Sequence, residues 1–160
     1  RERVIIVGTL PGSKDFIPPE PTCTKENHVT VSKAIADFAE MAENDEINHV
    51  WSKAKKSADQ GGRKMVADRP GYTIRAECHG NIQYHYSMPR RISMREAARI
   101  QSFPDDFIFD AKLRETERQV GNAVPPVFAW HVACSVLDAI SCESKEMESD
   151  FIPKKSTLCM

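Results

Sequence analysis

The sequence predicts a mixed α/β protein, because strand-like and helix-like hydrophobic patterns both occur along its 160 residues. A β-branched run covers residues 4–7 and ends at Gly8, which is the pattern of a buried strand. Three stretches, at residues 31–41, 93–103 and 125–140, place their apolar residues at helical spacing. A buried strand needs neighbours, and this one begins at the first residue. We therefore expect the chain to be cut from something longer.

The first third of the chain predicts a loop followed by a helix. Residues 9–27 are rich in proline, threonine and charge, so we expect a loop there. Thr30 is a good N-cap for a helix over residues 31–41, because its hydroxyl can accept a hydrogen bond from a free backbone N–H. Residues 43–64 are polar and irregular.

Residues 65–86 contain two strand-like pieces. Residues 73–76 and 82–86 are separated by His79-Gly80-Asn81, and this arrangement predicts a hairpin.

Two helices are expected in the second half. Ser93 and Glu96 have the spacing of a capping box, and Pro104 should end that helix. The last helix should open at Pro125-Pro126, since proline suits a first turn. Its apolar stripe must bury against something, and it consists of Ala129, Val132, Ala133, Val136, Leu137 and Ile140. Residues 143–160 are polar without a period, which predicts a disordered tail.

Composition narrows the class of protein. No stretch approaches the ~18 consecutive apolar residues of a membrane span, and the first residues are not a signal peptide. Five irregularly spaced cysteines favour a reduced protein, so a cytoplasmic location without a membrane is the default. The spacings of Cys23, His28, Cys78 and His79 fit no standard zinc pattern, and no metal is expected.

Charge is unevenly distributed. Residues 51–103 hold 11 Lys or Arg and four acids, a net charge of +7, whereas the regions on either side each carry −4. This middle region could be a footprint for a polyanion, or a solvated surface that happens to be basic. Charge alone does not decide between the two.

Residues 89–107 carry the most specific motif. The string Arg-Glu-Ala-Ala-Arg-Ile-Gln-Ser-Phe-Pro-Asp at residues 95–105 closely resembles the ninth sequence motif of the C5-cytosine DNA methyltransferases. That family usually has Thr where Ser93 stands, and either residue can cap a helix. The resemblance implies that this helix organises a target-recognition region.

Residues 118–126, Arg-Gln-Val-Gly-Asn-Ala-Val-Pro-Pro, resemble the tenth motif of the same family. The resemblance implies that Asn122, Ala123 and Val124 line the pocket for S-adenosylmethionine. It also implies that the helix after them returns to the catalytic domain. A Gly-Asn turn at a helix N-terminus would present free N–H groups and a short amide to a polar ligand.

The start of the chain is similar to the end of the eighth motif, in which arginines run into a strand. The resemblance implies that Arg3 points into the active site and holds the flipped cytosine, with Arg1 beside it. A rigid arginine fork suits a base oxygen that gains negative charge during attack.

Residues 9–88 stand where the family places its variable target-recognition domain, and residues 68–77 resemble the usual entry to it. Arginine can read guanine in the major groove, and asparagine or glutamine can read adenine. We therefore expect DNA contacts from seven residues, which are Thr73, Arg75, His79, Asn81, Gln83, Arg90 and Arg91.

The resemblance also implies the architecture. It predicts an α/β fold made of the carboxyl-terminal portion of a Rossmann-like S-adenosylmethionine-dependent methyltransferase and a small α+β target-recognition domain. Residues 1–8 would be a terminal strand of the catalytic domain, and 9–115 the DNA-reading domain. Residues 116–142 would return to the catalytic domain, and 143–160 would be the tail.

The family's catalytic motifs are not in this sequence. No cysteine follows a proline, and neither a Glu-Asn-Val motif nor a Phe-x-Gly-x-Gly loop occurs. We therefore expect a part of a DNA (cytosine-5)-methyltransferase, as in restriction-modification, that is inactive alone. Its partners would be duplex DNA and the missing amino-terminal catalytic region, in cis if the chain is a fragment or as a second subunit. The alternatives are a non-enzymatic DNA-binding module and an accessory subunit.

Overall fold

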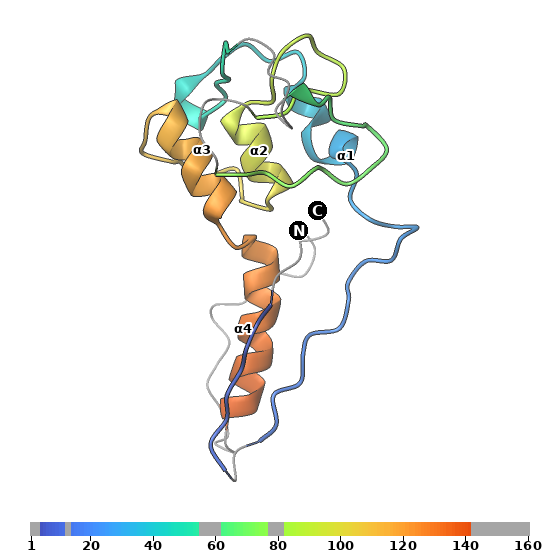
Figure 1. Ribbon diagram of the computed structural model, residues 1–160, viewed down its shortest axis with the longest axis vertical. Helices are drawn as coiled ribbons and strands as arrows, with labels where there is room; N and C mark the ends of the chain where they lie inside the picture. The colour runs from blue at the N-terminus through green and yellow to red at the C-terminus, as the bar shows by residue number, and fades with distance from the viewer. Residues whose placement is uncertain (1–3, 12–13, 55–61, 77–81, 142–160) are drawn as a thin grey trace.

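A computed structural model describes residues 4–11, 14–54, 62–76 and 82–141 of the chain (Figure 1). In chain order the helices are α1 (Val31–Ile35), the 3-10 helices η1 (Ala36–Phe38) and η2 (Asp45–Ile47), α2 (Met94–Ile100), α3 (Leu113–Asn122) and α4 (Pro126–Ile140). Figure 1 shows α1, α2 and α3 gathered in a head, from which α4 projects. The predicted tail at 143–160 lies outside the described residues.

The core of the head forms around α2. This helix packs against α1 on one side and α3 on the other. Among the described residues, every buried member of the main apolar cluster lies between residues 31 and 120; Val29 packs against it, and α4 supplies no member. The members are Val31, Ala34, Ile35, Met65, Ile74, Ile82, Ile92, Met94, Ala97, Ala98, Phe109 and Val120.

Both ends of α2 follow from its sequence. The capping box is confirmed, because the Glu96 N–H donates to Ser93 Oγ at 3.0 Å and the Ser93 N–H donates to Glu96 Oε2 at 2.7 Å. The helix ends at Ile100, before the expected Phe103. Ser102 takes a left-handed conformation with φ 64°, and the Phe103 N–H bonds back to the Ala98 carbonyl at 2.9 Å. This reversal is a common way to stop a helix.

The first helix is shorter than predicted. Thr30 caps α1 as expected, accepting from the Lys33 N–H at 3.3 Å. The helix leaves the α conformation at Ile35, where φ is −137°, and continues as the 3-10 helix η1. Ile35 and Phe38 are both buried. The tighter turn thus brings two apolar side chains three positions apart into the interior.

The predicted hairpin between residues 73–76 and 82–86 is wrong. Tyr84 instead forms isolated bridges with Lys64 and with Arg91. The described residues contain only such isolated bridges and no longer ladder. The return of the chain through Pro89 brings residues 90–92 back to 83–85, since His85 N bonds to Arg90 O and Ile92 N to Gln83 O.

Helix α3 was not predicted. Its buried residues are Thr116, Glu117, Val120 and Gly121, of which only valine is a typical core side chain. Gly121 and Asn122 form its carboxyl-terminal end, not a turn before the next helix. That end is closed by the Ala123 N–H, which donates to the Gln119 carbonyl at 3.0 Å.

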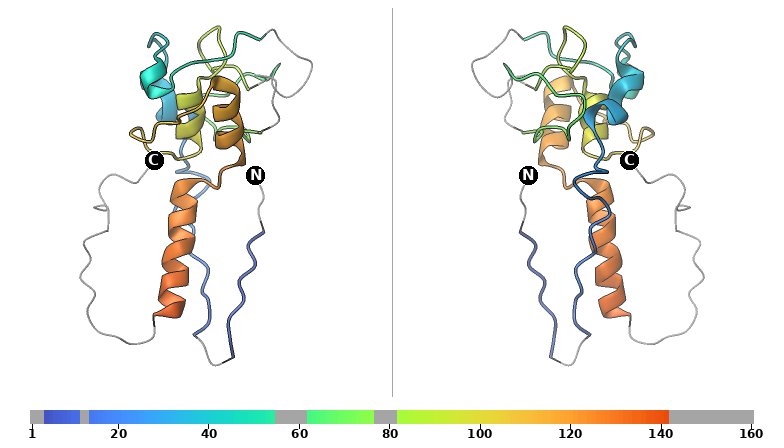
Figure 2. Two further views of the ribbon diagram at one scale, coloured as in Figure 1. Left: turned by 90° about the vertical axis from the view of Figure 1, so that its left-hand side faces the viewer. Right: turned by 90° about the vertical axis from the view of Figure 1, so that its right-hand side faces the viewer.

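Residues 4–11 and α4 lie outside the head. The predicted strand at residues 4–7 is extended but unpaired, and its side chains are exposed. Figure 2 shows this segment running alongside α4 without covering it. As predicted, α4 begins with a proline in its first turn, yet none of its residues is buried. The expected loop at residues 9–27 contains no helix or strand in its described part.

One helical stretch within the described ranges, Leu113–Ile140, is long and apolar enough by composition to cross a membrane. Two features argue against a span. The helical conformation is interrupted before Pro126, because α3 ends at Asn122 and Pro125 is not helical. The 15 residues of α4 cover about 22 Å, less than the ~30 Å of a bilayer core.

Candidate functional site

Arg90, an expected DNA contact, is held inside the head. Its guanidinium donates to both carboxylate oxygens of Glu96 at 2.8 Å and to the Phe38 carbonyl at 3.1 Å. It also stacks over the Trp51 ring, 4.4 Å from its centroid. Only 10% of its side chain is exposed. Arg90 therefore holds the start of α2 in place and has no donor fork directed at a DNA groove.

Arg91 is buried more completely. Its guanidinium lies over the Tyr84 ring at 4.7 Å and donates to the carbonyls of Ala54 and Ile82. Both side chains are largely buried in this conformation, so it gives no support to a DNA contact by Arg90 or Arg91, and that assignment stays a prediction. Residue type suggested DNA, but burial decides what an arginine can reach.

The two arginines of α2 are also used internally. Arg95 donates to the carbonyls of Ile47 and Phe107 at 2.8 Å and of Pro104 at 3.1 Å, and burial lowers its pKa. Arg99 bridges Asp37 and Asp105, each at 2.6 Å. Hydrogen bonding to Asp105 raises the pKa of Arg99 and lowers that of the aspartate. Much of the basic middle region thus ties loops to the head.

Gln83 is likewise buried, with 5% exposure. Its amide donates to the Thr73 carbonyl at 3.4 Å, so the side chain is engaged internally in this conformation and its reading of a base stays a prediction. The structure does place Gln83 against the segment that contains Thr73. His79 and Asn81 lie outside the described residues.

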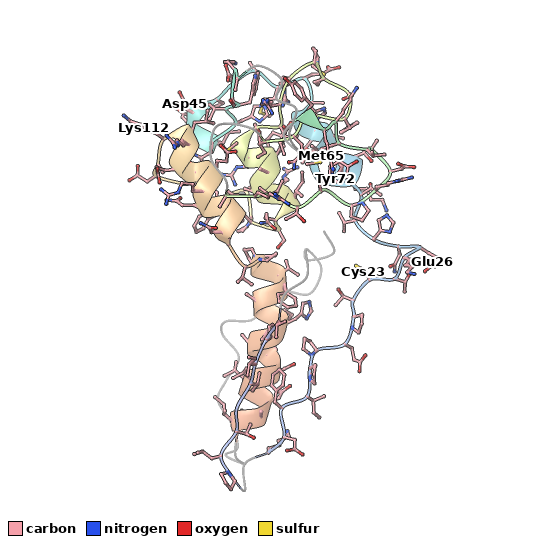
Figure 3. All side chains as sticks on the ribbon, in the orientation of Figure 1. Cys23, Glu26, Asp45, Met65, Tyr72 and Lys112 are labelled. Atoms are coloured by element: carbon pink, nitrogen blue, oxygen red, sulfur yellow. The ribbon has the colours of Figure 1, made fainter. Side chains whose placement is uncertain are left out.

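The segment of residues 62–76 carries several exposed basic side chains. Arg75 is exposed and Thr73 is half-buried, while Ile74 between them is in the core. Arg63 and Lys64 are exposed as well, and the Arg63 guanidinium lies 5.9 Å from the Tyr72 ring centroid. Figure 3 shows Tyr72 near Met65 on this part of the head. Sequence reasoning missed Arg63, Lys64 and Tyr72, although two adjacent basic residues in the basic region were a usable signal.

A buried polar network lies behind this surface. His49 Nδ1 and Ser93 Oγ are 2.9 Å apart, and His85 Nε2 lies 3.6 Å from Glu96 Oε1. His85 Nδ1 accepts from the backbone N–H groups of Ser87 and Met88, so its proton lies on Nε2. Burial lowers the pKa of both histidines. Because these side chains are fully buried, the network has the chemistry of an internal scaffold and not of a site open to substrate.

The expected cofactor residues come together at the junction of α3 and α4. Asn122 and Val124 are exposed, and Ala123 between them is half-buried. The Val127 N–H in the first turn of α4 donates to Ser102 Oγ at 3.2 Å, which ties the junction to the end of α2. The predicted Gly-Asn turn at a helix N-terminus is wrong, because those residues end α3. A polar amide and an apolar side chain nevertheless face outward side by side along the chain.

Arg1 and Arg3 lie outside the described residues. Their assignment to the flipped base stays a prediction.

Comparisons with a family model and with individual proteins agree on one family. Residues 12–138 match the sequence model described as C-5 cytosine-specific DNA methylase. The chain is 34% identical to "Type II methyltransferase M.NgoFVII" of Neisseria gonorrhoeae, over 99% of the chain and 51% of that relative. It is 36% identical to "Type II methyltransferase M.BbvI" of Brevibacillus brevis, over 79% of the chain and 41% of the relative. The chain thus spans about half the length of these relatives.

Proposed function

Because this chain belongs to the C-5 cytosine-specific DNA methylase family, we propose that it forms the carboxyl-terminal, DNA-reading part of a DNA (cytosine-5)-methyltransferase. The family implies the S-adenosylmethionine-dependent methyltransferase fold. The rest of that α/β fold, with the Cys nucleophile, would come from an amino-terminal catalytic region in the same chain or in a second subunit. The complete enzyme would work in the cytoplasm on duplex DNA.

The observation that carries the proposal is the state of α4. The 15-residue helix is mostly apolar, yet no residue of it is buried, and Leu137 and Ile140 are 57% and 68% exposed. Such a surface is stable in water only when another surface covers it. A catalytic region packed on α4 would supply that cover, and it would also draw residues 4–7 into a sheet.

The head would read DNA through residues 62–76. Arg63, Lys64 and Arg75 present positive charge there, which suits phosphate contacts that position a duplex. Arg75 and Thr73 remain our candidates for contacts with base edges. His79 and Asn81 remain predictions beside them.

The junction after α3 would form one wall of the cofactor pocket. The exposed amide of Asn122 suits the polar portion of S-adenosylmethionine, and Val124 suits an apolar ring face. When bound, the cofactor supplies the methyl group. Ala123 would complete this wall, with the other walls formed by the catalytic region.

Within this scheme the chain contributes recognition and positioning rather than bond formation. The target cytosine must leave the base stack, because C5 and C6 are shielded in the duplex. Arg3 would hold the flipped base with Arg1 beside it, and an arginine fork would stabilise negative charge at the base oxygen. No cysteine of the sequence follows a proline, so we expect no methyl transfer by the chain alone.

A chimera tests the proposal. This chain would replace the matching region of M.NgoFVII, and transfer of labelled methyl groups from S-adenosylmethionine to duplex DNA would be measured. The chimera should transfer methyl groups to cytosine, and the isolated chain should not. Turnover by the isolated chain would show that it is not a catalytically incomplete part. A soluble, folded chimera without activity, beside an active parent enzyme, would contradict the proposed role.

A non-enzymatic DNA-binding module would give a third result. The isolated chain would then bind duplex DNA, while the chimera would bind DNA but neither bind S-adenosylmethionine nor transfer methyl groups.

A further inference from the structure

Gly121 lies closer to another part of the backbone than any side chain would permit. A Cβ atom at this position would stand 2.4 Å from the Ala76 nitrogen, 2.5 Å from the Arg75 carbonyl carbon and 2.7 Å from the Ala76 Cα. All three are main-chain atoms, which cannot rotate away. The glycine is part of α3, where alanine is the better helix former by about 1 kcal/mol. Close packing, and not helix formation, therefore explains a glycine here.

The segment that Gly121 touches is the candidate reading segment. Ile74, near the carboxyl end of the segment, lies in the core with 2% exposure, while Tyr72 and Arg75 are exposed. Figure 1 shows this green segment crossing below α2 and reaching the lower end of α3. The contact with Gly121 therefore sets the depth at which the end of the segment lies against the head.

The same end of α3 leads directly into the candidate cofactor wall. Asn122 follows Gly121, and the amide of Gln101 donates to the Val120 carbonyl at 3.0 Å. This hydrogen bond attaches the end of α3 to the residue that caps the carboxyl end of α2. The reading segment and the cofactor wall consequently meet at one glycine.

We infer that Gly121 is a positioning residue that fixes Arg75 at the depth needed for reading DNA, relative to the cofactor wall at 122–124. This inference rests on the proposed function for what the segment reads. The contact itself does not depend on that function. A side chain at 121 should therefore displace residues 75–76 and alter base preference, beyond any general loss of stability.

The first test uses the isolated chain and trypsin, which cleaves after arginine and lysine. Proteolysis of a folded protein follows the population of the locally open state. An overlap that a Gly121→Ala change forces should raise cleavage after Arg75 on the order of tenfold. Cleavage after Lys64, where the next residue bonds to Tyr84, serves as the internal reference. An unchanged rate, or an equal rise at both sites, would overturn the inference.

Two other glycines provide matched controls. Gly8→Ala enters open space and should change neither cleavage rate. Gly71→Ala would meet the Ile100 Cγ2 methyl at 2.6 Å, which belongs to one side chain and not to the backbone, so its effect should be smaller than that of Gly121→Ala. An equal effect of all three would show that alanine at any glycine loosens the chain.

A second variant covers the case in which Gly121→Ala does not fold. Gln101→Met removes the hydrogen bond to Val120 and introduces no overlap at Gly121. It should raise cleavage after Arg75 more than cleavage after Lys64. If it raises neither or both equally, the attachment does not position the segment.

The second test measures sequence preference in the chimera with M.NgoFVII. Bisulfite sequencing of the methylated DNA reports which bases flank each methylated cytosine. With Gly121→Ala we expect a broader flanking preference, whereas a purely structural role would lower total methylation with unchanged preference and would overturn the inference. If the chimera with Gly121 methylates nothing, the proposed function fails, and the trypsin result still judges the contact.

Discussion

At the scale of single residues, the arginines of the 90–99 stretch show how burial changes the meaning of a charge. Arg90 is paired with a carboxylate that is itself fully buried, and Arg95 is surrounded by backbone carbonyls. Charged groups in the interior are tolerated when their donors are all used. The sequence places these arginines in a basic region, but the number of basic residues in a region does not reveal which of them are exposed to water. Two of the seven expected DNA contacts, Arg90 and Arg91, lie in the interior of this conformation and stay predictions.

Removing Arg90 should therefore be costly. Arg90→Ala leaves the Glu96 carboxylate buried without its main cation, and breaking such a pair costs about 3–5 kcal/mol. The matched control is Arg118→Ala, whose pair with Glu115 is half exposed on both sides and should contribute no more than about 1 kcal/mol. Urea unfolding of the two variants measures the difference. Similar losses in both would show that the Arg90–Glu96 pair is not a structural anchor.

Acid should weaken the head through its two buried histidines. Burial lowers the pKa of His49 and His85, so the folded head resists protonation while the unfolded chain takes up protons below about pH 6.5. The free energy of unfolding should be level above that pH and then fall by up to about 1.4 kcal/mol per pH unit for each histidine. The fall ends at the folded-state pKa of each group. Urea unfolding at pH 7.5 and 5.5 checks this.

The groups that face these histidines are Glu96 and Arg90, with Glu43 near His49 and Lys64 near His85. Glu96 favours the protonated forms, and the cations oppose them. His49→Gln should reduce the difference in stability between the two pH values. If the His49→Gln variant loses as much stability between pH 7.5 and 5.5 as the unchanged protein, other groups cause the acid sensitivity.

At the scale of elements, sequence patterns succeeded where local chemistry decides the structure. The capping box of α2, the Thr30 cap and the proline start of α4 were all predictable, because each depends on neighbouring residues. Helix α3 was missed because Thr116, Glu117 and Gly121 replace the usual apolar stripe on its buried face. The hairpin at 73–86 was wrong because Tyr84 bridges to Lys64, a pairing between distant residues that no local turn signals.

Ser102 connects two elements at a small conformational cost. Its left-handed backbone costs a non-glycine residue about 1–2 kcal/mol, but its hydroxyl accepts from the first turn of α4. Ser102→Gly should relieve the backbone and leave the stability of the head within about 1 kcal/mol, since glycine also loses more entropy on folding. The Val127 amide hydrogen should then exchange with solvent several-fold faster, because the free energy of one hydrogen bond, about 1 kcal/mol, is lost.

Ser102→Ala is the matched variant. It keeps the cost of the left-handed backbone and loses the hydroxyl, so the head should be less stable than with glycine. Slow Val127 exchange in both variants would mean that the hydroxyl does not hold α4.

At the scale of the whole molecule, the head and α4 are built differently. All members of the main core come from residues 31–120, so the head folds around its own interior. Helix α4 carries its apolar stripe outside that interior. The sequence predicted that the stripe must bury against something. Under the proposed function, the catalytic region of the complete enzyme would supply the surface that covers it, and the pattern of this chain alone does not encode that surface.

A charge on the stripe should separate folding from assembly. Leu137→Glu leaves the head untouched, so the thermal midpoint of the isolated chain should stay within a few degrees, because a surface change costs about 0.5 kcal/mol or less. In the chimera the same change places a charge in an apolar interface, and methyl transfer should fall at least tenfold. Ser135→Glu, on the polar side of the helix with His131 and Asp138, is the control. Full activity of the Leu137→Glu chimera would exclude this stripe as the interface.

The bare stripe of α4 also has a consequence for how much of this protein a cell can keep. Exposed apolar side chains are what chaperones and proteases act on, and small changes in the exposed population alter abundance several-fold. Copies of the chain whose α4 is covered would not be bound by chaperones or degraded by proteases, while uncovered copies would be degraded. The steady-state amount of the chain would then follow the supply of the surface that covers it, without any dedicated control of its synthesis.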